Sequence, residues 1–148
     1  MAKYKRILVA VDFSELSKRA THRAVELAGF YGAQLILMHV VEHFPEHLPH
    51  YRISREEKDP EEFILDRAAR DLRDLCDKVG MENAQTEVRL SRRSAKYELL
   101  NFVEENEIDL IVLGCGGHHY LTSMMAGSIA TGVVRAARCD VFTVRGDQ

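Results

Sequence analysis

Apolar residues along the chain fall into short continuous runs separated by longer periodic stretches. Nearly unbroken runs of this kind are typical of parallel strands that are covered by helices on both faces. Four of them occupy residues 7–11, 35–41, 110–113 and 141–144. A fifth segment, residues 86–90, alternates apolar and polar positions, which favours an edge strand with one wet face. The pattern therefore predicts five strands.

Between these runs, apolar residues recur at the three- and four-residue spacing of amphipathic helices. The predicted helices cover residues 16–31, 60–79, 95–103 and 128–137. The second has the clearest ends, because Asp59 can cap it, Pro60 suits its first position and Gly80 can close it. Alternating strands and helices predict an α/β fold.

The edge position of the third strand indicates how the sheet is ordered. With right-handed crossovers it favours the order 3-2-1-4-5, in a single Rossmann-like doubly wound domain over residues 1–148. Helices would cover both faces of this five-stranded parallel sheet. Ligands in such folds bind beyond the carboxyl ends of the strands where the order reverses. We therefore expect Asp12, after the first strand, to meet the residues that follow the fourth.

A glycine-rich segment follows the fourth strand. After Gly114 and Gly117 come nine further residues, 118–126, and then Gly127 and Ser128. Glycines let the backbone expose its N–H groups to an anion, and a helix opening at Ser128 would add the positive end of its dipole. The segment matches neither a Walker A loop nor a G-x-G-x-x-G fingerprint. Local sequence alone does not decide whether this segment is a phosphate-binding loop or only a tight connection between strand and helix.

Composition narrows the classes of partner. The chain has 148 residues, 46% hydrophobic and 29% charged, with a formal net charge of -3. No block of Lys or Arg stands out, which argues against a general nucleic-acid binder. The first apolar run is too short for a signal peptide or a membrane span, so we expect a cytoplasmic protein without membrane contact. Three cysteines without C-x-x-C spacing suggest neither a disulfide framework nor a zinc knuckle.

Several separated motifs make the chain resemble the universal stress protein (UspA) family over nearly its full length. They are the segments RILVAVDFS at residues 6–14, LMHV at 37–40, DLIVLG at 109–114 and ARCDV at 137–141. Nucleotide-binding members carry G-x-x-G, nine residues and then G-[ST], and this chain matches that pattern. The resemblance implies binding of ATP with magnesium, and a homodimer formed through the last strand.

The resemblance also implies which residues contact the nucleotide. They come from the ends of three strands and the last helix: Ala10, Val11, Asp12, Val40, Gly114, Gly117, Gly127, Ser128 and Ile129. Asp12 would accept hydrogen bonds from ribose hydroxyls, Val40 would meet adenine through its backbone, and Ser128 would hold phosphate or magnesium. As an alternative, Asp12 and Ser128 could simply cap helices.

Hydrolysis of ATP has weaker support than binding. The glycine segment supplies no Lys or Arg to neutralise charge on a transferred phosphoryl group. We therefore predict a regulatory role in stress response, with slow or no ATP hydrolysis and no catalytic residue assigned; His118 and His119 are read as solvated or packing groups. The alternative function is a dimeric interaction scaffold that binds no nucleotide, in which residues 114–128 only connect strand to helix.

The remaining histidines suggest no metal site. His43, His47 and His50 stand among prolines, which makes a continuous helix improbable, and we interpret them as part of an exposed loop. His39 interrupts the second apolar run, and we expect a hydrogen-bonded core histidine there.

Overall fold

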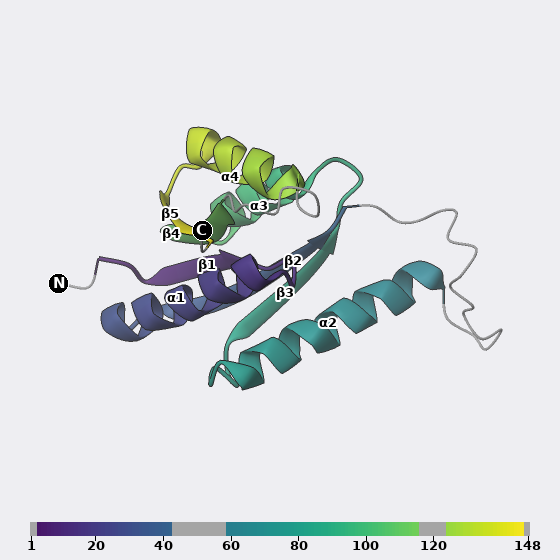
Figure 1. The fold of residues 1–148 in the computed structure, drawn as a ribbon, viewed down its shortest axis with the longest axis horizontal. Coiled ribbons are helices and arrows are strands. Elements are labelled where there is room, and N and C mark those ends of the chain that lie inside the picture. Colours follow the sequence, from purple (N-terminus) through teal and green to yellow (C-terminus); the bar gives the residue numbers. More distant parts are fainter. Residues whose placement is uncertain (1–2, 43–58, 116–123, 147–148) are drawn as a thin grey trace.

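Strands and helices alternate along the part of the chain that the computed structural model describes, residues 3–42, 59–115 and 124–146 (Figure 1). The elements are β1 (Arg6–Ala10), α1 (Glu15–Tyr31), β2 (Gln34–Val41), α2 (Pro60–Lys78), β3 (Gln85–Leu90), α3 (Ala95–Glu105), β4 (Leu110–Cys115), α4 (Met124–Ala136) and β5 (Asp140–Arg145). None of the described helices is long and apolar enough to cross a membrane.

The strands form one parallel sheet in the order β3-β2-β1-β4-β5. This confirms the predicted α/β fold and strand order, including the edge position of β3. In the register, Ala10 lies opposite Met38 and Val9 opposite Val112. The carboxyl ends of β1, β2 and β4 therefore reach the same edge of the sheet.

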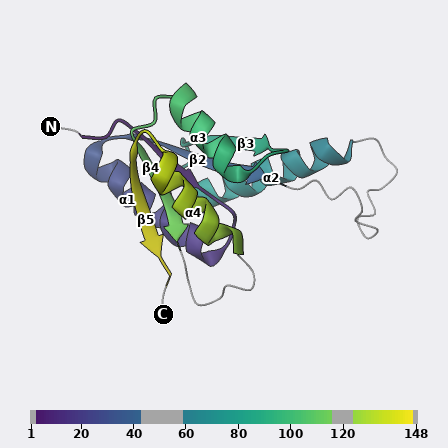
Figure 2. The ribbon, with the colours of Figure 1, turned by 90° about the horizontal axis from the view of Figure 1, so that it is seen from above.

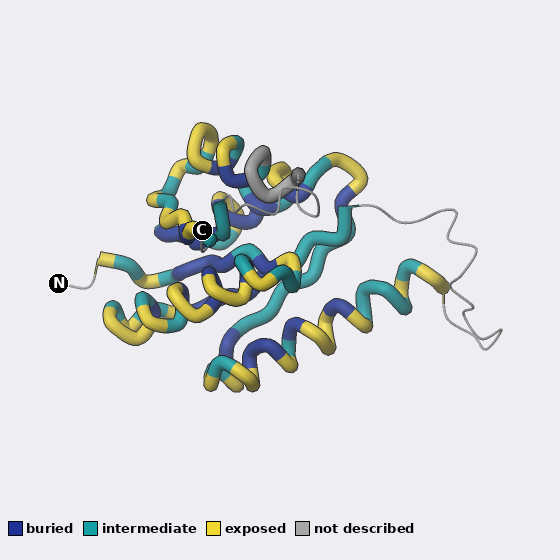
Figure 3. Tube along the Cα trace, viewed as in Figure 1, coloured by how far each residue is buried: buried dark blue, intermediate teal, exposed yellow. Residues whose placement is uncertain are grey.

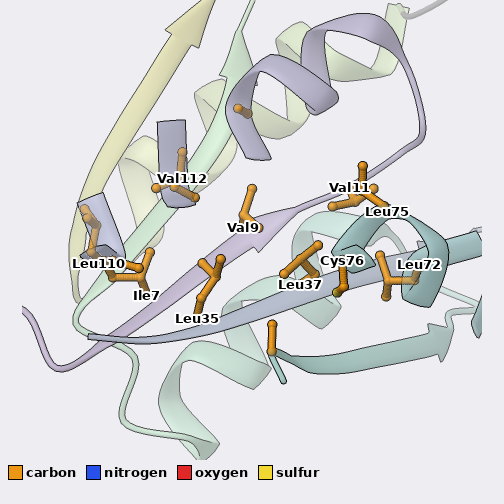
Figure 4. Close-up of a cluster of buried hydrophobic side chains, with 14 of the residues drawn as sticks. Ile7, Val9, Val11, Leu35, Leu37, Leu72, Leu75, Cys76, Leu110 and Val112 are labelled. Atoms are coloured by element: carbon orange, nitrogen blue, oxygen red, sulfur yellow. The ribbon is translucent and has the colours of Figure 1, made fainter. Parts of the chain in front are cut away.

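Helices cover both faces of the sheet, as Figures 1 and 2 show, with α1 and α2 on one face and α3 and α4 on the other. Successive side chains of a strand point to opposite faces, so each inner strand contributes to two cores. Ile7 and Val9 join the first core, drawn in Figure 4, with Leu72 of α2. Leu8 joins the second core with Phe102 of α3. Buried positions are concentrated in β1, β2 and β4, and Figure 3 shows others on the inner sides of the helices.

The predicted ends of the second helix are confirmed. The Asp59 side chain caps α2 by accepting a hydrogen bond from the Glu61 N–H at 3.2 Å, and Pro60 occupies the first position. The helix ends at Lys78, and Gly80 follows with a φ of 73°.

The prediction that the last helix opens at Ser128 is wrong, because α4 begins four residues earlier, at Met124. The segment Met-Met-Ala consists of good helix formers, and a glycine within a helix costs only about 1 kcal/mol, so Gly127 does not delay the start. The unpaired N–H groups of a helix belong to its first turn. Ser128 therefore lies beyond the cap position.

An arginine ties the edge strand β3 to α3. The Arg89 guanidinium lies 3.2 Å from a carboxylate oxygen of Glu87, 3.7 Å from Glu98 and 3.0 Å from Glu105. It also lies 5.1 Å from the centre of the Phe102 ring. These contacts hold α3 against the sheet. The first turns of α3 lie near the carboxyl end of β2.

Candidate functional site

A cavity of about 350 Å³ opens at the carboxyl ends of β1, β2 and β4. Side chains from the starts of α1 and α3 and from α4 complete its wall. Its volume falls within the range of about 300–1,000 Å³ found for small-molecule sites. It lies where the strand order reverses, which is the position at which open α/β sheets bind ligands.

Six of the nine residues predicted for the site line this one cavity: Ala10, Val11, Asp12, Val40, Gly114 and Ile129. The fold thus brings together positions more than a hundred residues apart in the sequence. Of the other three, Gly117 lies outside the described residues, and Gly127 and Ser128 are placed only as positions in α4.

The histidine predictions outside the sheet fall on parts of the chain that the structure does not describe. His43, His47, His50, His118 and His119 all lie outside the described residues. Within the described ranges, no group of three or more His, Cys, Asp or Glu side chains is arranged to hold a metal ion.

Sequence reasoning missed several residues of the cavity wall. Glu42 follows β2 as Asp12 follows β1, so the rule that selected Asp12 would also have selected Glu42. Ser14 could have been found, because a serine before a helix is a typical capping residue. Nothing in the sequence marks Ala95 and Leu99 as cavity residues, since apolar residues of an amphipathic helix form the same pattern whether they face a sheet or a cavity.

Asp12 stands in the turn between β1 and α1 with its carboxylate fixed on one side. Its Oδ1 accepts hydrogen bonds from the Ser14 N–H at 2.9 Å and from the Ser14 hydroxyl. The cap of α1 is Ser14 itself, whose Oγ accepts from the Ser17 N–H at 3.2 Å. Asp12 therefore supports the capping residue without being the cap. Asp12 is itself one of the residues that line the cavity.

The charge of Asp12 is stabilised by the same contacts. Partial burial raises the pKa of Asp12, but the hydrogen bonds from Ser14 and Ser17, together with the nearby His39 ring, outweigh this and hold the pKa below its ordinary value. Asp12 is consequently ionised at neutral pH and acts as a hydrogen-bond acceptor only.

The backbone of Val40 faces the cavity. Met38 accepts a hydrogen bond from the Val11 N–H at 2.8 Å on the β1 side, whereas Val41 accepts from the Ser91 N–H at 2.8 Å on the β3 side. Successive residues of a strand alternate in direction. Val40 therefore directs its N–H and C=O toward the β1 side, at a level where β1 has already ended. These two groups form an adjacent donor and acceptor beside the cavity.

Gly114 has a packing reason for being glycine. A Cβ atom at this position would lie 2.6 Å from Cγ of Leu16 on α1, closer than side chains pack. Leu16 and Gly114 both line the cavity. The close approach of β4 to α1 at Gly114 thus forms part of the cavity wall.

Taken together, the fold and cavity define a doubly wound α/β protein with a small-molecule-sized cleft at its switch point. A model of the universal stress protein family matches residues 3–145. Universal stress protein A homolog 1 of Coxiella burnetii is 34% identical over 141 residues, which cover 95% of this chain and 96% of that protein. The chain belongs to the universal stress protein family.

Two solved structures show the same fold. Universal stress protein UspA from Lactobacillus plantarum has a TM-score of 0.75 and 28% identity, and the match covers 98% of this chain and 100% of that one. A universal stress protein in complex with cAMP has a TM-score of 0.66 and 24% identity, covering 97% of this chain and 98% of that one. At that identity the second likeness shows the fold alone.

Proposed function

We propose that this universal stress protein binds ATP, with magnesium, in the cavity at the ends of β1, β2 and β4, and that the bound nucleotide regulates a cytoplasmic stress response. The observation that carries the proposal is the convergence of six predicted contact residues on one cavity of about 350 Å³. The same-fold protein solved with cAMP supports an adenine nucleotide as the class of ligand.

The polar groups of the cavity suit the nucleoside part of ATP. The N–H and C=O of Val40 match the acceptor and donor on the edge of adenine, and the Asp12 carboxylate can accept hydrogen bonds from the ribose hydroxyls. Asp12 and Glu42 are the charged residues among the described lining, and both are acidic. Since like charges repel, the phosphates would turn away from these two carboxylates.

The phosphates would then extend past Gly114 and Ile129 toward α4. The start of a helix carries the positive end of its dipole and its unpaired N–H groups, which favour anions. In this proposal Gly117, Gly127 and Ser128 hold the phosphates, and the Ser128 hydroxyl is a ligand of magnesium. Bound magnesium would neutralise phosphate charge.

Binding is expected without rapid turnover. The described lining of the cavity contains no Lys or Arg that could stabilise charge on a transferred phosphoryl group. We therefore expect ATP hydrolysis to be slow or absent.

Calorimetric titration of nucleotide-stripped protein with ATP and magnesium tests the proposal. Native protein should show saturable binding, Asp12→Asn should bind about tenfold more weakly because a charged acceptor is lost, and Gly127→Val should block the phosphate side. Asp74→Asn, the same exchange at an exposed position of α2, is the matched control and should bind as the native protein does. Well-folded native protein that binds no ATP would instead favour the interaction scaffold.

We also propose a homodimer through β5. This strand lies at the sheet edge, and Phe142 is 38% exposed. Exposed strand edges are normally covered or blunted in native proteins. Sedimentation analysis should show a dimer that Phe142→Lys weakens, and a native protein that stays monomeric at all concentrations would contradict this proposal.

A further inference from the structure

One side chain of β2 holds the turn that carries Asp12. The Nδ1 atom of His39 lies 2.6 Å from the carbonyl oxygen of Val11. Because a carbonyl oxygen can only accept, Nδ1 carries the hydrogen and donates it. Val11, the residue directly before Asp12, is therefore tied to β2 twice, by its N–H to the Met38 carbonyl at 2.8 Å and by its own carbonyl to the His39 ring.

The residue directly after Asp12 is held by the same ring. The ring of Phe13 lies 4.8 Å from that of His39, centre to centre, with the planes tilted by 50°. Phe13 has a φ of 63°, in the left-handed region that bulky residues rarely adopt. Such a backbone persists only where its surroundings hold it. The contact with His39 supplies part of that support.

Asp12 thus stands between two residues that His39 fixes, one by a hydrogen bond and one by ring packing. His39 is half-buried and belongs to the face of the sheet opposite Val40, since neighbouring strand residues alternate in direction. In the described part of the chain it does not line the cavity, whereas Asp12 does. His39 therefore acts on a ligand through Asp12 and the turn that carries it.

We propose that His39 is a positioning residue for the nucleotide site, which holds the turn of residues 11–13 so that the Asp12 carboxylate meets the ribose hydroxyls of the ligand. This inference rests on the proposed function. His39 itself makes no contact with the ligand. Its loss should consequently reduce the recognition of the ribose hydroxyls and leave the contacts of the base and phosphates in place.

The test compares ATP with 2′,3′-dideoxy-ATP, which lacks the hydroxyls. The readout is the ratio of their dissociation constants, measured with magnesium in native protein and in variants of position 39. His39→Phe keeps a ring of similar size but has no donor, whereas His39→Asn restores an N–H near the position of Nδ1. His22→Phe, at an exposed position of α1, controls for exchange of a histidine. His39→Leu replaces His39→Phe if that variant does not fold, as judged by thermal unfolding.

We expect native protein and His22→Phe to prefer ATP by about tenfold or more, as a hydrogen bond to a charged group provides. His39→Phe should lose most of that preference through weaker ATP binding, with little change for dideoxy-ATP, and His39→Asn should regain it. A folded His39→Phe or His39→Leu protein that keeps the native ratio would overturn the inference while leaving nucleotide binding intact. Native protein that binds ATP without preference would also overturn it. Absence of binding to either nucleotide would overturn the proposed function as well.

Discussion

Replacing Gly114 with alanine tests how closely β4 approaches α1 beside the cavity. The added Cβ would lie 2.6 Å from Cγ of Leu16 and 3.1 Å from its Cδ2. Cγ is bonded directly to Cβ of Leu16, so it cannot swing away unless the whole side chain changes rotamer or α1 shifts.

The expected loss of stability follows from two opposing effects. Overpacking a well-packed site costs about 1–3 kcal/mol. Restricting the unfolded backbone by replacing glycine offsets about 0.4–1 kcal/mol of this. The two ranges combine to a loss of about 0–2.6 kcal/mol, and we expect Gly114→Ala to fall in the middle of this interval, at about 1–2 kcal/mol. For a chain of this length, each kcal/mol corresponds to about 2–4 °C in Tm.

Thermal and urea unfolding of four proteins would measure this effect: native, Gly114→Ala, Leu16→Ala and the double variant. Shortening Leu16 removes the clash, so the double variant should be more stable than the sum of the single changes predicts, by about 0.5–3 kcal/mol. Gly132→Ala is the control, because the atoms nearest to its Cβ, which are Cδ, Cγ and Cε, all belong to the flexible Lys96 side chain. Additive single changes, or a Gly114→Ala protein as stable as native, would refute the close approach.

Two further predictions concern the start and the end of α1. The pKa of Asp12 is lowered in the fold, so its ionised form stabilises the protein fully above the ordinary value of about 3.9, and this stabilisation is lost as the pH falls through the lowered value. The Tm difference between native protein and Asp12→Asn should therefore stay constant from pH 6 to about pH 4 and shrink as the pH falls further, and a difference that stays constant down to about pH 2 would contradict this reasoning. Gly29→Ala should stabilise the exposed end of α1 by about 0.5–1 kcal/mol, since nothing lies within 4 Å of its Cβ. Gly32→Ala should destabilise it by about 1–2 kcal/mol, because the Gly32 cap has a φ of 65°; unfolding curves that reverse this order would show the cap assignment to be wrong.

The strand order was predictable because one strand differs in pattern from the others. Residues 86–90 alternate where the inner strands are continuously apolar, and β3 is the edge strand. The start of α4 was not predictable in the same way. Glycine and serine at positions 127 and 128 imitate a helix start, but the good helix formers before them extend the helix. Local composition cannot decide between a glycine that ends a turn and one that lies inside a helix.

The residues of the candidate site that could be predicted are those at the carboxyl ends of strands. Asp12, Val40 and Gly114 lie at the carboxyl ends of strands, and topology alone brings these ends together. The left-handed backbone of Phe13 and its contact with His39 depend on tertiary packing, and no local pattern of residues indicates them.

The most direct test of ATP binding in this cavity is a residue-resolved NMR titration of nucleotide-stripped protein with ATP and magnesium, which detects weak as well as tight binding. The proposal predicts saturable shifts of the backbone amides of Ala10, Asp12, Val40 and Ile129 at a single dissociation constant, with α2 unchanged. Amide shifts that stay constant up to millimolar ATP, or that change only away from the ends of β1, β2 and β4, would contradict it.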